Sequence, residues 1–163
     1  IFENYVRIIT VEGVSVEMIT WDNSGMEGQE RLRRMSYEQA HVVLICFDMS
    51  NWDSLDNVST VWSEEANYYL KNVPRILVGC KADLTEDPKT IAELQRQGQR
   101  IPTTQEAEEL AQKIKAIAYF ETSAKDSKGL DELFEYAVKA SLVKTLKKGI
   151  RRFLSRSEIK FVR

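Results

Sequence analysis

The stretch Val42-Val43-Leu44-Ile45-Cys46-Phe47, preceded by His41, is the longest apolar run in this chain of 163 residues. Its length and its β-branched residues are typical of a strand that is buried on both faces. Two shorter runs of the same kind follow at Ile76–Val78 and Ala118–Phe120. Continuous runs of this type predict the central strands of a parallel sheet.

Helical patterns lie between these strand-like runs. Apolar residues recur at helical spacing over residues 55–62, 110–114 and 130–141, and Thr103-x-x-Glu106 after Pro102 predicts a capping box. At the start of the chain, residues 2–9 and 14–21 alternate in part around Glu12-Gly13, which predicts an antiparallel hairpin. We therefore expect an α/β fold, a doubly wound and mostly parallel sheet with its ligand site at the carboxyl ends of the strands.

Composition narrows the class of protein. Hydrophobic content of 43% and charged content of 29% are ordinary for one globular domain, and the longest apolar run is too short to span a membrane. Cys46 and Cys80 both lie in or beside strand-like runs, so we expect reduced core thiols in a cytoplasmic protein. His41 is the single histidine, which excludes a His-based metal cluster and argues against a Ser/His/Asp triad.

Two segments that follow predicted strands carry the chemistry. In Gly79-Cys80-Lys81-Ala82-Asp83-Leu84, the carboxylate of Asp83 can accept two parallel hydrogen bonds from the ring N–H and the exocyclic amine of a guanine, a pair that adenine does not offer. The aliphatic stem of Lys81 can lie over the purine. In the second segment, Ser123-Ala124-Lys125 would close the other side of the ring. Each segment alone also fits an ordinary turn, but their joint occurrence favours a guanine site.

These two segments resemble the base-recognition motifs of small GTPases. Trp21–Glu27 resembles the D-x-x-G switch element, and Arg31–Tyr37 continues it in the manner of Rho GTPases. Ile1–Tyr5 looks like the end of the Rho effector loop, and the polar residues 85–101 fall where Rho proteins carry an insert helix. The resemblance runs over residues 1–142 and implies a Rho-type G domain with an α/β, P-loop NTPase-like fold.

The resemblance also implies a cofactor and residue roles. GTP or GDP would bind with Mg²⁺, Asp22 would hold the metal through water, and the Gly25 amide would contact the γ-phosphate. Cys80 stands in the base motif where many relatives have Asn or Thr. Met26 replaces the Gln that orients the attacking water, and a thioether cannot donate a hydrogen bond. Gly28-Gln29-Glu30 repeats the family's G-Q-E letters three residues later, but Gln29 is out of register without a gap.

The phosphate side of the expected site has no counterpart in the sequence. No G-x-x-x-x-G-K-[ST] occurs, and none of the seven glycines is followed by Lys. The family's first strand, phosphate loop and first helix would all precede Ile1, and we interpret the start of the chain as a truncation. We expect unpaired edges on the neighbouring strands, and weak GTP binding or none by residues 1–163.

Residues 143–163 are predicted to form a basic amphipathic tail. From Lys144 onward there are eight basic residues against Glu158 alone, although the net charge of the chain is −2. Leu142, Leu146, Ile150, Phe153 and Leu154 continue a helical stripe. This pattern predicts contact with an anionic membrane surface, and the open alternative is a helix extension with a disordered end. The chain ends in Lys160-Phe161-Val162-Arg163 without a prenylation box, and nucleic acid is not expected as a partner.

Two functions follow from this reading. The leading hypothesis is a Rho-type guanine nucleotide switch with slow hydrolysis, which signals to effectors and, by resemblance, to the cytoskeleton. The alternative is a GTPase-derived interaction module that uses the Phe2–Tyr5 and Arg31–Tyr37 surfaces without cycling or binding nucleotide. Either would be cytoplasmic, with peripheral contact at the inner membrane surface as an option. The resemblance implies that the complete family protein is an enzyme that hydrolyses GTP. Whether residues 1–163 are an enzyme stays open, because Met26 replaces the Gln and the phosphate loop is absent.

Overall fold

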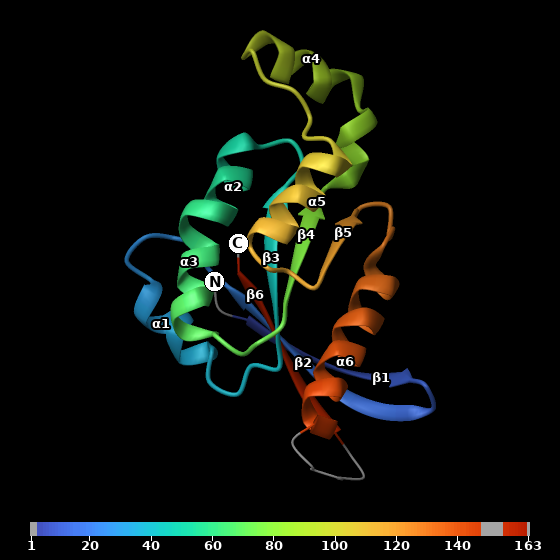
Figure 1. The fold of residues 1–163 in the computed structure, drawn as a ribbon. Helices are drawn as coiled ribbons and strands as arrows, with labels where there is room; N and C mark the ends of the chain where they lie inside the picture. The colour runs from blue at the N-terminus through green and yellow to red at the C-terminus, as the bar shows by residue number, and fades with distance from the viewer. Residues whose placement is uncertain (1–2, 148–154, 163) are drawn as a thin grey trace.

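The computed structural model describes residues 3–147 and 155–162, and the described strands form one six-stranded sheet (Figure 1). The strand order across the sheet is β1-β2-β6-β3-β4-β5. The strands are β1 (Glu3–Val11), β2 (Val14–Asn23), β3 (Val42–Asp48), β4 (Arg75–Cys80), β5 (Ala118–Thr122) and β6 (Ser155–Val162).

Helices cover both faces of this sheet. The described helices are α1 (Glu30–Ser36), α2 (Trp52–Asn57), α3 (Ser63–Tyr69), α4 (Pro88–Arg96), α5 (Thr104–Lys113) and α6 (Leu130–Lys147), with a π-helical turn over Val58–Trp62 and a 3₁₀ turn over Ala82–Glu86. One core contains residues of α2, α3 and α5 with Val43, Ile45 and Phe47 of β3. The other contains α6 with Leu44 and Cys46 of the same strand. The predicted α/β class is thus confirmed, because β3 is buried from both sides.

The amino-terminal strands form the predicted hairpin. β1 pairs antiparallel with β2, and the turn between Val11 and Val14 has positive φ at both Glu12 (52°) and Gly13 (78°). Such a turn matches the right-handed twist of the two strands. β1 is the outermost strand and is largely exposed, whereas β2 turns Val16, Met18 and Ile19 into the protein.

β6 corrects the prediction made for the end of the chain. It lies between β2 and β3 and runs parallel to both, with registers from Val16↔Ser155 to Asn23↔Val162 on one side and from Val42↔Ile159 to Ile45↔Val162 on the other. Ile159 is fully buried in the core beneath α6. The expectation of unpaired edges beside a missing strand is therefore wrong, because β6 supplies both ladders.

The start of the predicted helical stripe is helical, since Leu142 and Leu146 both lie in α6. α6 continues without a break past residue 142 to Lys147, so the predicted boundary at residue 143 lies inside a helix. Residues 155–162 are in the sheet rather than in a free tail. Three residues of the predicted stripe, Ile150, Phe153 and Leu154, lie outside the described residues.

The polar segment at residues 85–101 contains a helix, which agrees with its short helical pattern. α4 begins after Asp87, whose Oδ2 accepts a hydrogen bond from the Thr90 amide at 2.8 Å. Leu94 is its one buried residue, and the chain leaves the helix through Gly98 with φ +70°. In Figure 1 this helix stands beyond the carboxyl ends of β4 and β5, away from the sheet.

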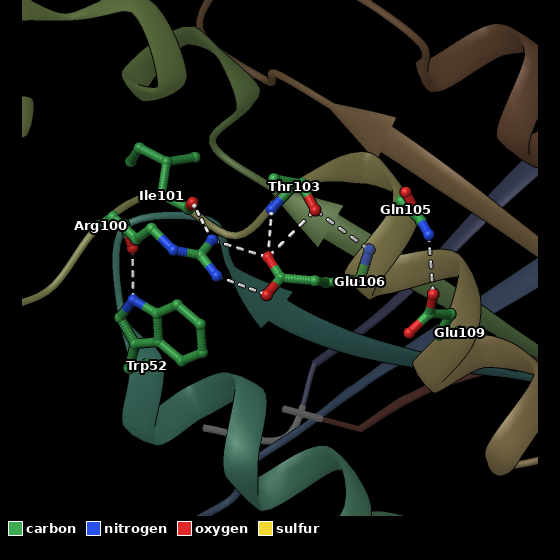
Figure 2. A network of polar contacts seen from close by, with 7 residues as sticks. All are labelled: Trp52, Arg100, Ile101, Thr103, Gln105, Glu106 and Glu109. Atoms are coloured by element: carbon green, nitrogen blue, oxygen red, sulfur yellow. Dashed lines mark hydrogen bonds and ion pairs between the residues drawn. The ribbon is translucent and has the colours of Figure 1, made fainter.

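A network of polar contacts holds the end of this segment against α2 and α5 (Figure 2). The Arg100 guanidinium donates to both carboxylate oxygens of Glu106, at 2.7 and 2.5 Å, and lies over the Trp52 ring at 5.6 Å. The Trp52 indole N–H in turn donates to the Arg100 carbonyl. Glu106 also accepts from the Thr103 amide at 2.9 Å and completes the predicted capping box of α5. α2, α5 and the end of the insert segment are thus joined at one point.

Candidate functional site

The two predicted base-recognition segments lie side by side at the carboxyl ends of adjacent parallel strands. β4 pairs with β5 through Gly79↔Glu121 and Cys80↔Thr122. Beyond this edge, Asp83 Oδ1 accepts a hydrogen bond from Ser123 Oγ at 2.7 Å, and Lys125 Nζ lies 3.5 Å from Asp83 Oδ2. The hydrogen bond from Ser123 lowers the pKa of Asp83, and the nearby Lys125 ammonium adds to this effect. Asp83 is therefore an ionised acceptor at neutral pH.

The local backbone conformation of both segments brings Asp83 close to Ser123 and Lys125. Lys81 has a left-handed conformation (φ 60°, ψ 40°) that turns the chain from β4 into the 3₁₀ turn over Ala82–Glu86. On the other side, Ser123 pairs with Lys128, and Gly129 has φ +73° before α6 begins. A Cβ atom on Gly129 would lie 2.4 Å from the Glu121 carbonyl oxygen, so glycine is required there.

A cavity of about 690 Å³ opens beside these two segments. The predicted base-recognition residues Cys80, Lys81, Asp83, Ala124 and Lys125 line it, together with Asp22 of β2. The remaining lining is mostly apolar and comes from β1 to β5, the 3₁₀ turn and α6, including Cys46, Val78, Leu133 and Phe134. A comparable volume with few polar groups is typical of small-ligand sites. A hollow of about 710 Å³ beside α4 contains none of the predicted site residues.

The predicted phosphate-side residues are brought together only in part. Asp22 lines the cavity near the end of β2, whereas Gly25 and Met26 follow in the connection to α1 and are not among its lining residues. Met26 is 65% exposed, and its amide donates to Ser24 Oγ at 3.3 Å. Gln29 lies at the amino-terminal end of α1, and its Oε1 is buried without a hydrogen-bond partner among the described residues. Within the described residues, no group of three acidic, histidine or cysteine side chains could hold a metal ion.

The predicted Arg31–Tyr37 surface is exposed in part and buried in part. Leu32 and Met35 are exposed, but the side chains of Arg33 and Tyr37 turn inward. Arg33 donates two hydrogen bonds to the Glu65 carboxylate of α3, at 2.9 and 2.7 Å, and Tyr37 donates a third at 2.6 Å. Although burial opposes ionisation, these donors lower the pKa of Glu65. The segment therefore has a structural role that the sequence did not predict.

Asp48 is the site residue that sequence reasoning missed. It ends β3 directly opposite Cys80, and its Oδ2 lies 2.6 Å from Lys81 Nζ. A carboxylate at the carboxyl end of a buried strand was a signal that could have pointed to it. Phe2–Tyr5 was the other surface predicted to contact partner proteins. Asn4 and Tyr5 lie in β1, and Phe2 is outside the described residues.

Comparison with known proteins agrees with this arrangement. The family model described as Ras family matches residues 1–143. The chain belongs to the Ras family. Its curated relatives place it among the Rho-family small GTPases. GTP-binding protein rho5 of Schizosaccharomyces pombe is 47% identical over 144 residues, which cover 88% of this chain and 72% of that protein. GTP-binding protein RHO1 of Saccharomyces cerevisiae is 47% identical over 143 residues, covering 88% and 68%.

The matched region contains every predicted site residue of this Rho-family chain, from Asp22 to Lys125. It ends at residue 143, so β6 lies outside it. No helix of the described residues is both long enough and apolar enough to cross a membrane.

Proposed function

We propose that this Rho-family protein is a guanine nucleotide switch and that Asp83 selects the base. The observation that carries the proposal is the geometry of Asp83, a nearly buried carboxylate held by Ser123 and Lys125 at the edge of the cavity. Both carboxylate oxygens can accept from the paired N–H donors of guanine. Adenine does not offer this pair of N–H donors, so it would lose the two charge-assisted hydrogen bonds that guanine makes with the carboxylate.

Removal of the Asp83 carboxylate tests this selection. We expect the parent chain to bind guanosine more tightly than adenosine, and Asp83→Ala to weaken guanosine binding by about 10- to 100-fold, since hydrogen bonds to charged groups are lost. NMR titration can measure dissociation constants in the millimolar range. Glu86→Ala is the matched control, because Glu86 is an exposed acid in the same turn. Equal loss of guanosine and adenosine binding in Asp83→Ala would contradict the proposed role.

Asp22 and Gly25 are proposed for the phosphate side. Mg²⁺ usually keeps several waters and binds through one or two carboxylates together with nucleotide phosphates. The carboxylate of Asp22 at the cavity is compatible with that mode. Since no phosphate-loop motif occurs in residues 1–163, we expect these residues alone to bind GTP more weakly than the micromolar range. Micromolar or tighter binding in a calorimetric titration would overturn this expectation.

Hydrolysis is proposed to be slow. The exposed thioether of Met26 stands where the family carries a water-orienting Gln, and it has no hydrogen to donate. GTP would therefore persist, and signalling would continue until the nucleotide dissociates. Exposed residues of α1, namely Arg31, Leu32, Arg34 and Met35, would contact effectors or regulators, and cytoskeletal signalling follows from the family alone.

An interaction module without nucleotide is the second candidate. The exposure of Tyr5 (59%), Leu32 (53%) and Met35 (69%) favours it, because these side chains are available to a partner on the two surfaces that the sequence indicates. Guanosine binding by the parent chain would favour the switch, and its absence would favour the interaction module.

Membrane contact through the basic residues 144–152 remains part of the proposal, and equal binding to neutral and anionic vesicles would contradict it.

A further inference from the structure

Lys81, which would lie against the base, is held at its charged end by a residue of the neighbouring strand. Its Nζ lies 2.6 Å from Asp48 Oδ2. The Lys81 side chain is 60% exposed and the Asp48 side chain 22%, so the acid is the more firmly enclosed partner. A lysine side chain that is free in solution samples many rotamers, and each immobilisation costs conformational entropy. The ion pair removes part of that freedom before any ligand arrives.

Asp48 is itself fixed by contacts that do not involve Lys81. Its Oδ1 accepts hydrogen bonds from the Ser50 amide at 2.8 Å and from Ser50 Oγ at 2.7 Å. The Met49 amide donates to the Cys80 carbonyl at 3.0 Å and ties the ends of β3 and β4 together. Burial opposes ionisation of Asp48, but the Lys81 ammonium and the Ser50 donors outweigh it and lower its pKa. The carboxylate is thus a rigid, charged anchor.

The cavity shows which part of Lys81 this anchor leaves for a ligand. Among the described residues, Lys81 lines the cavity and Asp48 does not. The ammonium is therefore paired with a carboxylate outside the cavity lining, which leaves the methylene stem as the part of Lys81 that a ligand can contact. An aliphatic stem in this position offers an apolar surface to a planar ring.

We propose that Asp48 is a positioning residue for guanine binding: it holds the Lys81 stem along the cavity and so prepares the surface on which the purine lies. This inference rests on the proposed guanine site. It adds a residue whose effect on the ligand passes through Lys81 alone. Because a preformed contact saves the ordering of one flexible side chain, its loss should weaken binding about three- to tenfold.

Guanosine is the appropriate probe, because it has no phosphate that the Lys81 ammonium could attract. Its dissociation constant is measured by NMR titration for the parent chain, Asp48→Asn, Lys81→Met and the double variant. Lys81→Met keeps an apolar stem of similar length and removes the tether from the other side. Asp53→Asn is the control, since Asp53 is an exposed acid of α2 that undergoes the same change of charge.

We expect each single variant to bind guanosine three- to tenfold more weakly, the double variant to bind no more weakly than the singles, and Asp53→Asn to match the parent chain. Additive losses in the double variant would overturn the inference, because Asp48 would then act independently of Lys81. Unchanged or tighter binding by Asp48→Asn would overturn it as well, while leaving the proposed function intact. No guanosine binding by the parent chain would overturn both. If Asp48→Asn fails to fold, Lys81→Met is compared with the parent chain. Guanosine binding that is three- to tenfold weaker supports the inference, and unchanged binding overturns it.

Discussion

At the scale of single residues, charged side chains in this protein work in connected groups. Asp83 is held by Ser123 and Lys125, whereas Glu65 is enclosed by Arg33 and Tyr37. The first group faces the cavity and can exchange partners with a ligand. The second is buried between α1 and α3, with side-chain exposures of 3% for Arg33 and 11% for Glu65, and so acts on stability. Position relative to the cavity separates the two roles.

The buried pair gives a stability prediction. Glu65→Ala would leave the Arg33 guanidinium buried without its carboxylate, and losing one partner of a buried ion pair costs about 3–5 kcal/mol. We expect the free energy of unfolding in urea to fall by that amount. Glu64→Ala, at the exposed neighbouring position of the same helix, should change it by less than about 0.5 kcal/mol. A similar small loss in both variants would show that the Arg33–Glu65 pair contributes little.

Acid stability should depend on Glu106. Hydrogen bonds from Arg100, together with the Thr103 amide, lower the pKa of Glu106 from 4.5 to about 2. Between these two values the unfolded chain binds more protons at this position than the folded chain, so stability falls as the pH falls from 4.5 towards 2. Glu106→Gln keeps a hydrogen-bonding side chain and removes the titration. We expect melting temperatures of this variant to depend less steeply on pH over that window than those of the parent chain and of Glu108→Gln. Identical slopes in all three would contradict the prediction.

At the scale of elements, β6 determines how the two halves of the sheet are joined. β2 and β3 do not pair with each other. Among the described strands, β2 pairs only with β1 and β6, and β3 pairs only with β4 and β6, so β6 alone connects the two halves. Strands buried within a parallel sheet are usually apolar throughout, as β3 is from Val42 to Phe47. β6 instead reads Ser-Arg-Ser-Glu-Ile-Lys-Phe-Val, in which charged and apolar residues are mixed, and Ile159 is buried.

Ile159 therefore tests whether β6 occupies this place. Ile159→Ala removes a fully buried side chain from the core under α6, which typically costs about 2–5 kcal/mol. Ile8→Ala on β1 is the control, since Ile8 is 71% exposed and should contribute less than about 0.5 kcal/mol. Urea unfolding measures both. An equally small effect at the two positions would mean that β6 does not pair between β2 and β3.

At the scale of the whole molecule, sequence patterns predicted an element correctly where the local preference of the residues agrees with their tertiary contacts. The runs at residues 42–47 and 76–78, the Glu12-Gly13 turn and the Thr103–Glu106 capping box all predicted the elements that form. β6 was not predicted, because it has no continuous apolar run and the helical stripe before it suggested that the helix continued, although its charged residues alternate with Ser157, Ile159 and Phe161 as in a strand. It is stabilised by two backbone ladders whose partners lie more than 100 residues away in the sequence. Tertiary pairing of this kind overrides local preference.

The same distinction applies to the site. Asp83 and Ser123 were predicted to face one ligand because both follow strands, and the structure brings them within 2.7 Å of each other. The contact of Asp48 with Lys81 was not predicted, because it depends on the register between β3 and β4, which single strands do not reveal. Residues that follow a strand end can thus be assigned from sequence, whereas the neighbours that orient them require the sheet.

The most direct test of this account is a competition between guanosine and adenosine for the isotope-labelled chain, followed on the amide signals of Lys81–Leu84 and Ser123–Lys125. We expect guanosine to shift both sets of signals together, and an equal concentration of adenosine not to displace it. Shifts confined to the hollow beside α4, or equal displacement by adenosine, would contradict the claim that these two segments form one guanine-selective site.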